Sequence, residues 1–174
     1  MKAKERQMDR ATAEKIMDFL TQIGVLFERA SIEQETFLPG LHLHRVLQID
    51  LDKLAFAGDI LHEAGHIAVC EPQERQFLHG DIYKNGLLNG RESQRMHGEE
   101  IAATALAVAA ITHLGLQLNL VFHEEGYRGG SNSLIDAFSQ GKGFGFPLLV
   151  AWEMVDSEKG YPYMQKWIRE MSRL

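Results

Sequence analysis

Two histidines and a glutamate lie close together in the stretch ILHEAGHIAV, residues 60–69. In a helix, positions i and i+4 share one face, so His62 and His66 would project in the same direction about one turn apart. Zinc accepts neutral imidazole nitrogen and tolerates a coordination position left open to water. Glu63 stands where H-E-x-x-H metallohydrolases have their general base. The spacing therefore predicts a catalytic Zn²⁺ site, with Glu63 deprotonating a zinc-activated water.

The residues around the motif are apolar. Ile60, Leu61, Ala64 and Ile67 predict a buried helix, where unpaired histidine and glutamate side chains would be costly. A bound metal removes that cost. A motif of three fixed positions also occurs by chance, and the protein would then be purely structural. The buried setting favours the zinc interpretation over coincidence.

A catalytic zinc has three protein ligands plus water, so one ligand must come from elsewhere in the chain. The stretch HGEEIAATALAVAA, 97–110, places two glutamates at the start of an apolar helix. Glu100 shares a face with Ala103 and Thr104, whose hydroxyl could support the carboxylate. Glu99 has no such polar neighbour, so Glu100 is the preferred ligand and Glu99 the alternative. Both could instead be first-turn acids that the helix dipole favours. The other candidates for the third ligand are Glu71, His79, His97, His113 and His123.

The motif followed by a glutamate-headed, alanine-rich helix resembles the gluzincin type of minimal zinc peptidase. The run EIAATALA, 100–107, is similar to the E-x-x-A-x-x-F-A pattern of ImmA/IrrE-like proteins, with a leucine where phenylalanine is usual. The resemblance covers residues 54–110, and H-E-x-x-H is its sharpest element. It implies a zincin-like fold and a peptide or protein substrate.

The same resemblance implies roles for individual residues. His62, His66 and Glu100 would bind the zinc, and Glu63 would be the base. In zincins a strand ahead of the motif helix commonly borders the cleft, which here is the predicted strand at 41–51.

His42 and His44 alternate with leucines in that predicted strand, so they share one of its faces. An i, i+2 pair of imidazoles could bind a metal. The simpler explanation is the solvated side of an edge strand. The resemblance adds a third possibility, contact with substrate.

A glycine-rich stretch, VFHEEGYRGGSN at 121–132, contains further polar side chains. Amide hydrolysis develops an oxyanion that needs a donor beyond the metal. His123 or Tyr127 would suit that role, since loops present side chains into clefts. A polar surface loop is the alternative explanation.

Hydrophobic periodicity and turn signals predict the elements that must position these residues. We expect an α+β, zincin-like fold with two central buried helices, a small antiparallel sheet and extra C-terminal helices. The expected elements are helices at 11–23, 52–70, 97–114 and 161–171, a helix beginning at Pro147, and strands at 25–32 and 41–51.

Length and composition indicate one ordinary globular domain, residues 1–174, with 45% hydrophobic and 24% charged residues. The net charge of −6 argues against a nucleic-acid partner. The longest apolar stretch, 101–111, is too short for a membrane span. The single cysteine, Cys70, rules out an internal disulfide, and the polar N-terminus lacks a signal core, so we expect a cytoplasmic protein.

These observations lead to two functional hypotheses. The first is a zinc metallohydrolase, a peptidase above all. The second is a metal-binding sensor or regulatory protein that uses the same residues without peptidase activity. Neither hypothesis defines a substrate or an oligomeric state.

Overall fold

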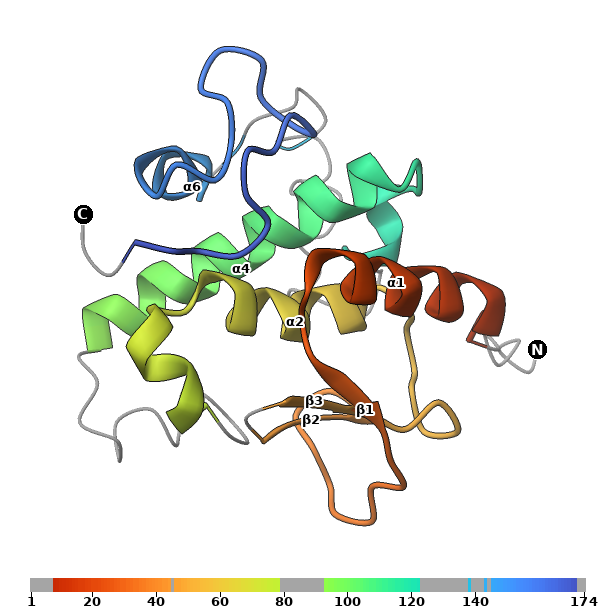
Figure 1. Ribbon diagram of the computed structural model, residues 1–174. Coiled ribbons are helices and arrows are strands. Elements are labelled where there is room, and N and C mark those ends of the chain that lie inside the picture. Colours follow the sequence, from red (N-terminus) through yellow and green to blue (C-terminus); the bar gives the residue numbers. More distant parts are fainter. Residues whose placement is uncertain are drawn as a thin grey trace.

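The fold is organised around two packed helices that carry the candidate metal ligands (Figure 1). The computed structural model describes residues 8–44, 46–78, 93–122, 138, 143 and 145–171. Within those residues the chain forms four α-helices, two short 3-10 helices and one three-stranded sheet. This combination of a small sheet and packed helices confirms the α+β class.

Helix α1, Arg10–Ile23, confirms the first predicted helix. The side chain of Asp9 caps its start by accepting a hydrogen bond from the backbone N–H of Ala11, at 3.0 Å. Gly24 ends it with a φ of 82°, a left-handed conformation that costs glycine little. The buried face of α1 then packs against the motif helix.

The sheet is mixed, and the prediction of an antiparallel pair is wrong. Strand β1, Phe27–Arg29, pairs in parallel with β3, Val46–Ile49. Strand β2, Leu41–His44, pairs antiparallel with β3, so the order is β1-β3-β2. The predicted single strand at 41–51 is therefore a tight hairpin. The predicted alternation of buried and exposed residues is confirmed, because the leucines of β2 and the Leu47 and Ile49 side chains are all buried.

The motif helix α2, Asp59–Val69, begins seven positions later than predicted from 52–70. Asp50 accepts hydrogen bonds from backbone N–H groups that precede α2. Its side chain accepts from Asp52, and its carbonyl oxygen accepts from Leu54. At Gly58 an added Cβ would lie 1.7 Å from the carbonyl oxygen of Leu120. The turn at Asp50 occupies residues that the prediction placed in the helix, and α2 begins after it.

The second core helix α4, Ser93–His113, lies along α2, and the sheet lies on the other side of α2 (Figure 1). From Ala102 to Ile111 every residue of α4 is buried, as its apolar composition predicts. It begins a turn earlier than expected. Buried hydrophobic side chains from α1, the sheet, α2 and α4 form one continuous cluster.

The C-terminal part departs most from expectation. Helix α6, Phe146–Ala151, begins with Pro147 in its first turn, as predicted, and packs against α4. The predicted helix at 161–171 is wrong, because this segment is an extended chain with turns. Its backbone N–H groups bond to distant carbonyls: Gln165 donates to Met154 at 2.8 Å and Arg169 to Ala68 at 2.7 Å. Those long-range bonds replace the local ones of a helix.

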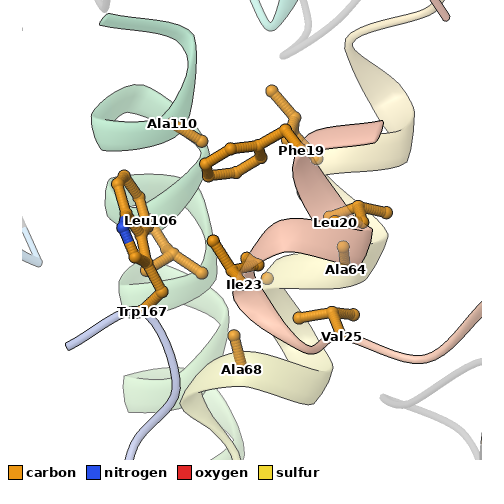
Figure 2. Close-up of a pocket in the computed structure, with 11 residues that line it drawn as sticks. Phe19, Leu20, Ile23, Val25, Ala64, Ala68, Leu106, Ala110 and Trp167 are labelled. Atoms are coloured by element: carbon orange, nitrogen blue, oxygen red, sulfur yellow. The ribbon is translucent and has the colours of Figure 1, made fainter. Parts of the chain in front are cut away.

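A small apolar pocket lies where α1, α2, α4 and the C-terminal segment meet (Figure 2). Phe19 and Trp167 close it with an edge-to-face contact, their ring centroids 5.0 Å apart. From α2 it is lined by the face that contains Leu61 and Ala68. His62 and His66 lie on a different face of that helix, so the pocket is separate from the candidate metal site. No helix in the described part of the chain is long and apolar enough to cross a membrane.

Asp50 holds together the connection between the sheet and α2, and its replacement should be measurable. Its two carboxylate oxygens accept from the backbone N–H groups of Ile32, at 2.9 Å, and Asp52, at 3.1 Å. Asn has only one acceptor oxygen, so Asp50→Asn leaves one of these N–H groups without its partner. We expect the free energy of unfolding in urea to fall by about 1–2 kcal/mol near pH 7.

This loss should depend on pH. The hydrogen bond from Ile32, with those from Asp52 and Lys53, holds the pKa of Asp50 below its ordinary value of 3.8. A lowered folded pKa stabilises the protein above the unfolded value, and the stabilisation disappears as the pH falls through the folded pKa. The gap between wild type and Asp50→Asn should therefore narrow below about pH 3.8. A gap independent of pH would contradict this account.

Candidate metal centre

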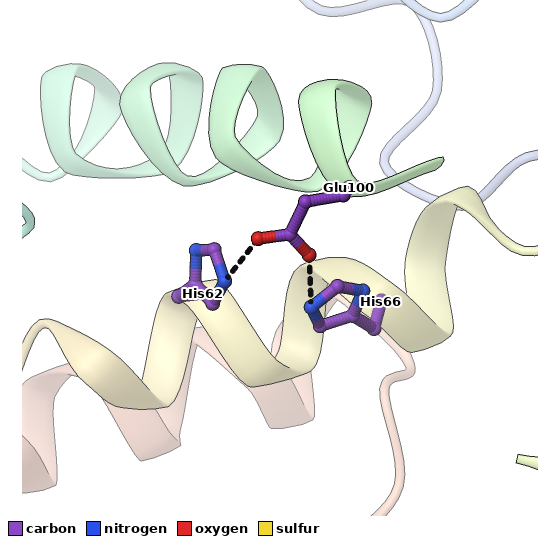
Figure 3. Close-up of side chains that lie close together, drawn as sticks. All are labelled: His62, His66 and Glu100. Atoms are coloured by element: carbon purple, nitrogen blue, oxygen red, sulfur yellow. Dashed lines mark ion pairs between the residues drawn. The ribbon is translucent and has the colours of Figure 1, made fainter. Parts of the chain in front are cut away.

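Helix α2 presents His62 and His66 on one face, toward α4 (Figure 3). The two imidazole rings have centroids 5.1 Å apart and stand nearly perpendicular. His66 is buried, with 6% of its side chain exposed, and His62 is 12% exposed. The i, i+4 spacing thus places two imidazoles side by side in a largely water-free position.

Glu100 completes the cluster from the facing helix. Its Oε1 lies 3.2 Å from His62 Nε2, and its Oε2 lies 2.9 Å from His66 Nε2 (Figure 3). One ligand atom from each residue lies within 4.8 Å of the others. Among the described residues this is the one group of three or more candidate ligands that could hold a metal ion. The structure therefore brings Glu100 to the histidines.

The donor set fits zinc. Two imidazole nitrogens and a carboxylate are typical of open zinc sites, in which ligand atoms about 2.0–2.1 Å from the ion lie about 3.3 Å from one another. The observed separations of 3.2 and 2.9 Å are slightly shorter. The contact of Glu100 Oε2 with His66 Nε2 is close but lacks hydrogen-bond geometry, so in the described structure this buried oxygen and His62 Nδ1 have no hydrogen-bond partner. A cation among these atoms would satisfy the carboxylate oxygen.

The electrostatics of the cluster are those of an ion pair. Burial alone would raise the pKa of Glu100, but the contacts from His62 and His66 hold that pKa far below its ordinary range. Burial likewise disfavours protonated His62, yet the adjacent Glu100 carboxylate outweighs it and raises the pKa of His62. A metal cation among these side chains would likewise compensate the negative charge of the carboxylate.

Glu63 follows His62 on α2 and is half-buried. Burial raises the pKa of its carboxyl, and the neighbouring His66 and His62 oppose that rise. The residue is outside the three-residue cluster, so its carboxylate is available for a role other than ligation.

Glu99, the alternative ligand, occupies a different environment. It is buried, and its Oε1 lies 3.9 Å from Nη1 of Arg169. Arg169 is itself buried and places its guanidinium over the ring of Trp152, 3.9 Å from the centroid. Glu99 is outside the histidine cluster of the described structure. It belongs instead to the contact between α4 and the C-terminal segment.

Two arginines at the end of α2 were missed by sequence reasoning. Arg75 Nε donates to the carbonyl oxygen of Ile67 at 2.9 Å, and Arg169 Nη1 donates to that of Val69 at 3.1 Å. Arg75 also donates to the carbonyl oxygen of Arg169. Together they satisfy carbonyls that the last turn leaves open and place positive charge at the negative end of the helix dipole. The position of Arg75 a few residues beyond α2 could have indicated a contact with the end of that helix. The position of Arg169 in the sequence gives no such indication.

The Thr104 hydroxyl does not support the Glu100 carboxylate as predicted. It donates to the backbone carbonyl oxygen of Glu100, at 3.2 Å, as threonine commonly does one turn along a helix. Thr104 therefore interacts with the helix backbone at Glu100 and not with the carboxylate.

At Gly65, inside the motif, α2 and α4 approach each other closely. A Cβ there would lie 2.8 Å from the carbonyl oxygen and 3.2 Å from the Cβ of Ala103. Alanine is favoured over glycine in a helix by about 1 kcal/mol. Gly65→Ala should nevertheless lower the free energy of unfolding by about 1–3 kcal/mol, because the packed helices must separate.

A matched control lies on α4. Among the described residues, a Cβ added at Gly98 would meet only Leu148, at 3.9 Å, so Gly98→Ala should stabilise the protein by up to about 1 kcal/mol. Thermal unfolding of both variants measures the two effects. Stabilisation by Gly65→Ala would show that the close approach is unimportant.

Of the other candidates for the third ligand, Glu71 and His113 are outside the cluster of the described structure, and His79 and the side chain of His97 are not among the described parts of the chain. The oxyanion and strand candidates divide in two. His123 and Tyr127, the predicted oxyanion donors, lie outside the described residues. His42 and His44 lie on β2, on the face of the sheet opposite the buried leucines. They are not part of the cluster on α2 and α4.

Comparisons with protein families, curated proteins and solved structures find no match to this chain.

Proposed function

We propose that this protein is a zinc-dependent metallohydrolase of zincin-like architecture that acts on a peptide or protein. The observation that carries the proposal is the convergence of His62, His66 and Glu100 from two packed helices, with Glu63 beside them on α2. Three ligands of this type leave a coordination position for water, as catalytic sites require.

The chain's own residues supply the remaining functions. Bound zinc would act as a Lewis acid and lower the pKa of a coordinated water. His62, His66 and Glu100 would hold the ion. Glu63 would accept the proton that the attacking water loses, a role that calls for a carboxylate near the metal but not bound to it. The oxyanion donors His123 and Tyr127 stay predictions from the sequence.

The architecture supports the zincin-like assignment. A glutamate ligand on a helix packed against the H-E-x-x-H helix is the arrangement that the resemblance to gluzincin and ImmA/IrrE-like peptidases implies. The three-stranded sheet ahead of α2 is the second element in common. This likeness is the reason for preferring an amide substrate.

Metal analysis tests the proposal directly. Protein purified without added zinc and then dialysed should contain about one zinc per chain. The His62→Ala/His66→Ala variant should contain none, and His113→Gln, which removes an exposed imidazole elsewhere, should match wild type. A wild-type protein that is metal-free and fails to bind added Zn²⁺ would eliminate the proposed site.

A further inference from the structure

The solvent face of the sheet carries a row of polar side chains across three strands. Glu28 on β1, Gln48 on β3 and His42 on β2 lie opposite one another in the sheet register. His44 follows two positions along β2, and its ring is stacked on that of His42 with centroids 6.2 Å apart and planes at 10°. Two imidazoles are thus presented side by side on the sheet, on elements that supply no ligand to the α2–α4 centre.

Hydrogen bonds across this row define which nitrogen of His42 is available. The Glu28 carboxylate can only accept, so the Gln48 side chain donates its amide N–H to it, at 2.7 Å. This orientation turns the amide oxygen of Gln48 toward His42 Nδ1, at 3.1 Å. Nδ1 of a neutral imidazole must then carry the hydrogen, and Nε2 keeps its lone pair. Metal-binding histidines are commonly oriented in this way, by a hydrogen bond that the second ring nitrogen donates.

We propose that His42 and His44 form a second metal site that binds a divalent transition ion such as Zn²⁺. Imidazole nitrogen is a preferred donor for zinc and copper, and water would complete the coordination. His42 is half-buried and held by Gln48, so it is the fixed ligand. His44 is exposed, so it can turn its ring toward the ion held by His42. With two protein ligands, the site binds more weakly than the three-residue centre and exchanges its metal readily.

Calorimetric titration of the dialysed, metal-stripped protein with Zn²⁺ tests the proposal. Wild type should show two binding events, and His42→Ala or His44→Ala should each lose the weaker one. Gln48→Leu keeps both imidazoles but removes the acceptor for Nδ1, and it should weaken the second event about 10-fold. His113→Gln is the matched control and should retain both events. A weaker event that survives removal of either His42 or His44, or that is missing from wild type, would overturn the proposal.

The titration can refute either of the two proposed metal sites independently of the other. In His62→Ala/His66→Ala the tight event should disappear and the weaker one remain, since the strand pair does not depend on α2. If wild type shows only a weak event that His42→Ala abolishes, the proposed hydrolase fails while the second site stands. If only a tight event is seen, and the α2 variant abolishes it, the second site fails and the hydrolase proposal stands.

Discussion

Replacing Glu100 by glutamine is expected to lower zinc affinity by more than the roughly 10- to 100-fold that the loss of a supporting residue costs. Glutamine keeps the size of the side chain but removes the charge that lies 3.2 and 2.9 Å from the two imidazoles. The expected result is loss of bound zinc after dialysis, with the helical circular dichroism of wild type. Competition titration against a chromophoric chelator measures the change.

Glu99→Gln is the matched control, because it makes the same chemical change one position away. The carboxylate of Glu99 faces Arg169, so this variant should keep its zinc and lose stability instead, by about 1–3 kcal/mol. Together the variants separate ligation from packing. Loss of zinc from Glu99→Gln with retention in Glu100→Gln would reverse the assignment of the third ligand.

The preference for Glu100 depended on Thr104 sharing its helix face. That shared face was predictable because helical periodicity is local, but the hydroxyl donates to the backbone carbonyl of Glu100 and not to its carboxylate. A helix of regular pitch decides which residues share a face, and Glu100, Ala103 and Thr104 do so wherever the helix lies. The packing of this face against α2 is a tertiary contact that helical periodicity does not encode. The part played by Gly65 was missed, since a glycine inside a motif does not reveal which backbone approaches it.

The sheet shows where periodicity stops being informative. Alternating burial continues from β2 into β3 because His44 pairs with Val46. The buried side chains on one face are Leu41, Leu43, Leu47 and Ile49. An uninterrupted strand and a tight hairpin therefore have the same pattern here. The parallel pairing of β1 with β3 is a non-local choice, which no pattern within either strand encodes.

The end of α2 depends on contacts even farther apart in sequence. Arg169 reaches the carbonyl oxygen of Val69, 100 positions earlier. An arginine in a polar C-terminal segment is expected to lie on the surface, since arginine is mostly exposed in folded proteins. Its burial over Trp152 becomes evident only when the chain is folded.

Glu63→Gln should leave zinc binding intact and lower kcat by about 10²–10⁴-fold, the usual contribution of a general base. Glutamine occupies the same volume beside His62, but its amide cannot take a proton from water. The zinc content should equal that of wild type, because Glu63 is outside the ligand cluster of the described structure. A defined mixture of synthetic peptides, followed by mass spectrometry, supplies the substrate and the rate.

The outcome of this experiment decides between the two hypotheses for the site. Hydrolysis by wild type that falls in Glu63→Gln at equal zinc content establishes the enzyme and its base. Hydrolysis that is unchanged in Glu63→Gln removes this residue from the mechanism. Zinc-loaded wild type that cleaves no peptide of the mixture, while His62→Ala/His66→Ala loses the metal, favours a metal sensor, because ligation would then be intact without the reaction. Substitution of Glu63 thus tests the catalytic step, and substitution of Glu100 tests metal binding.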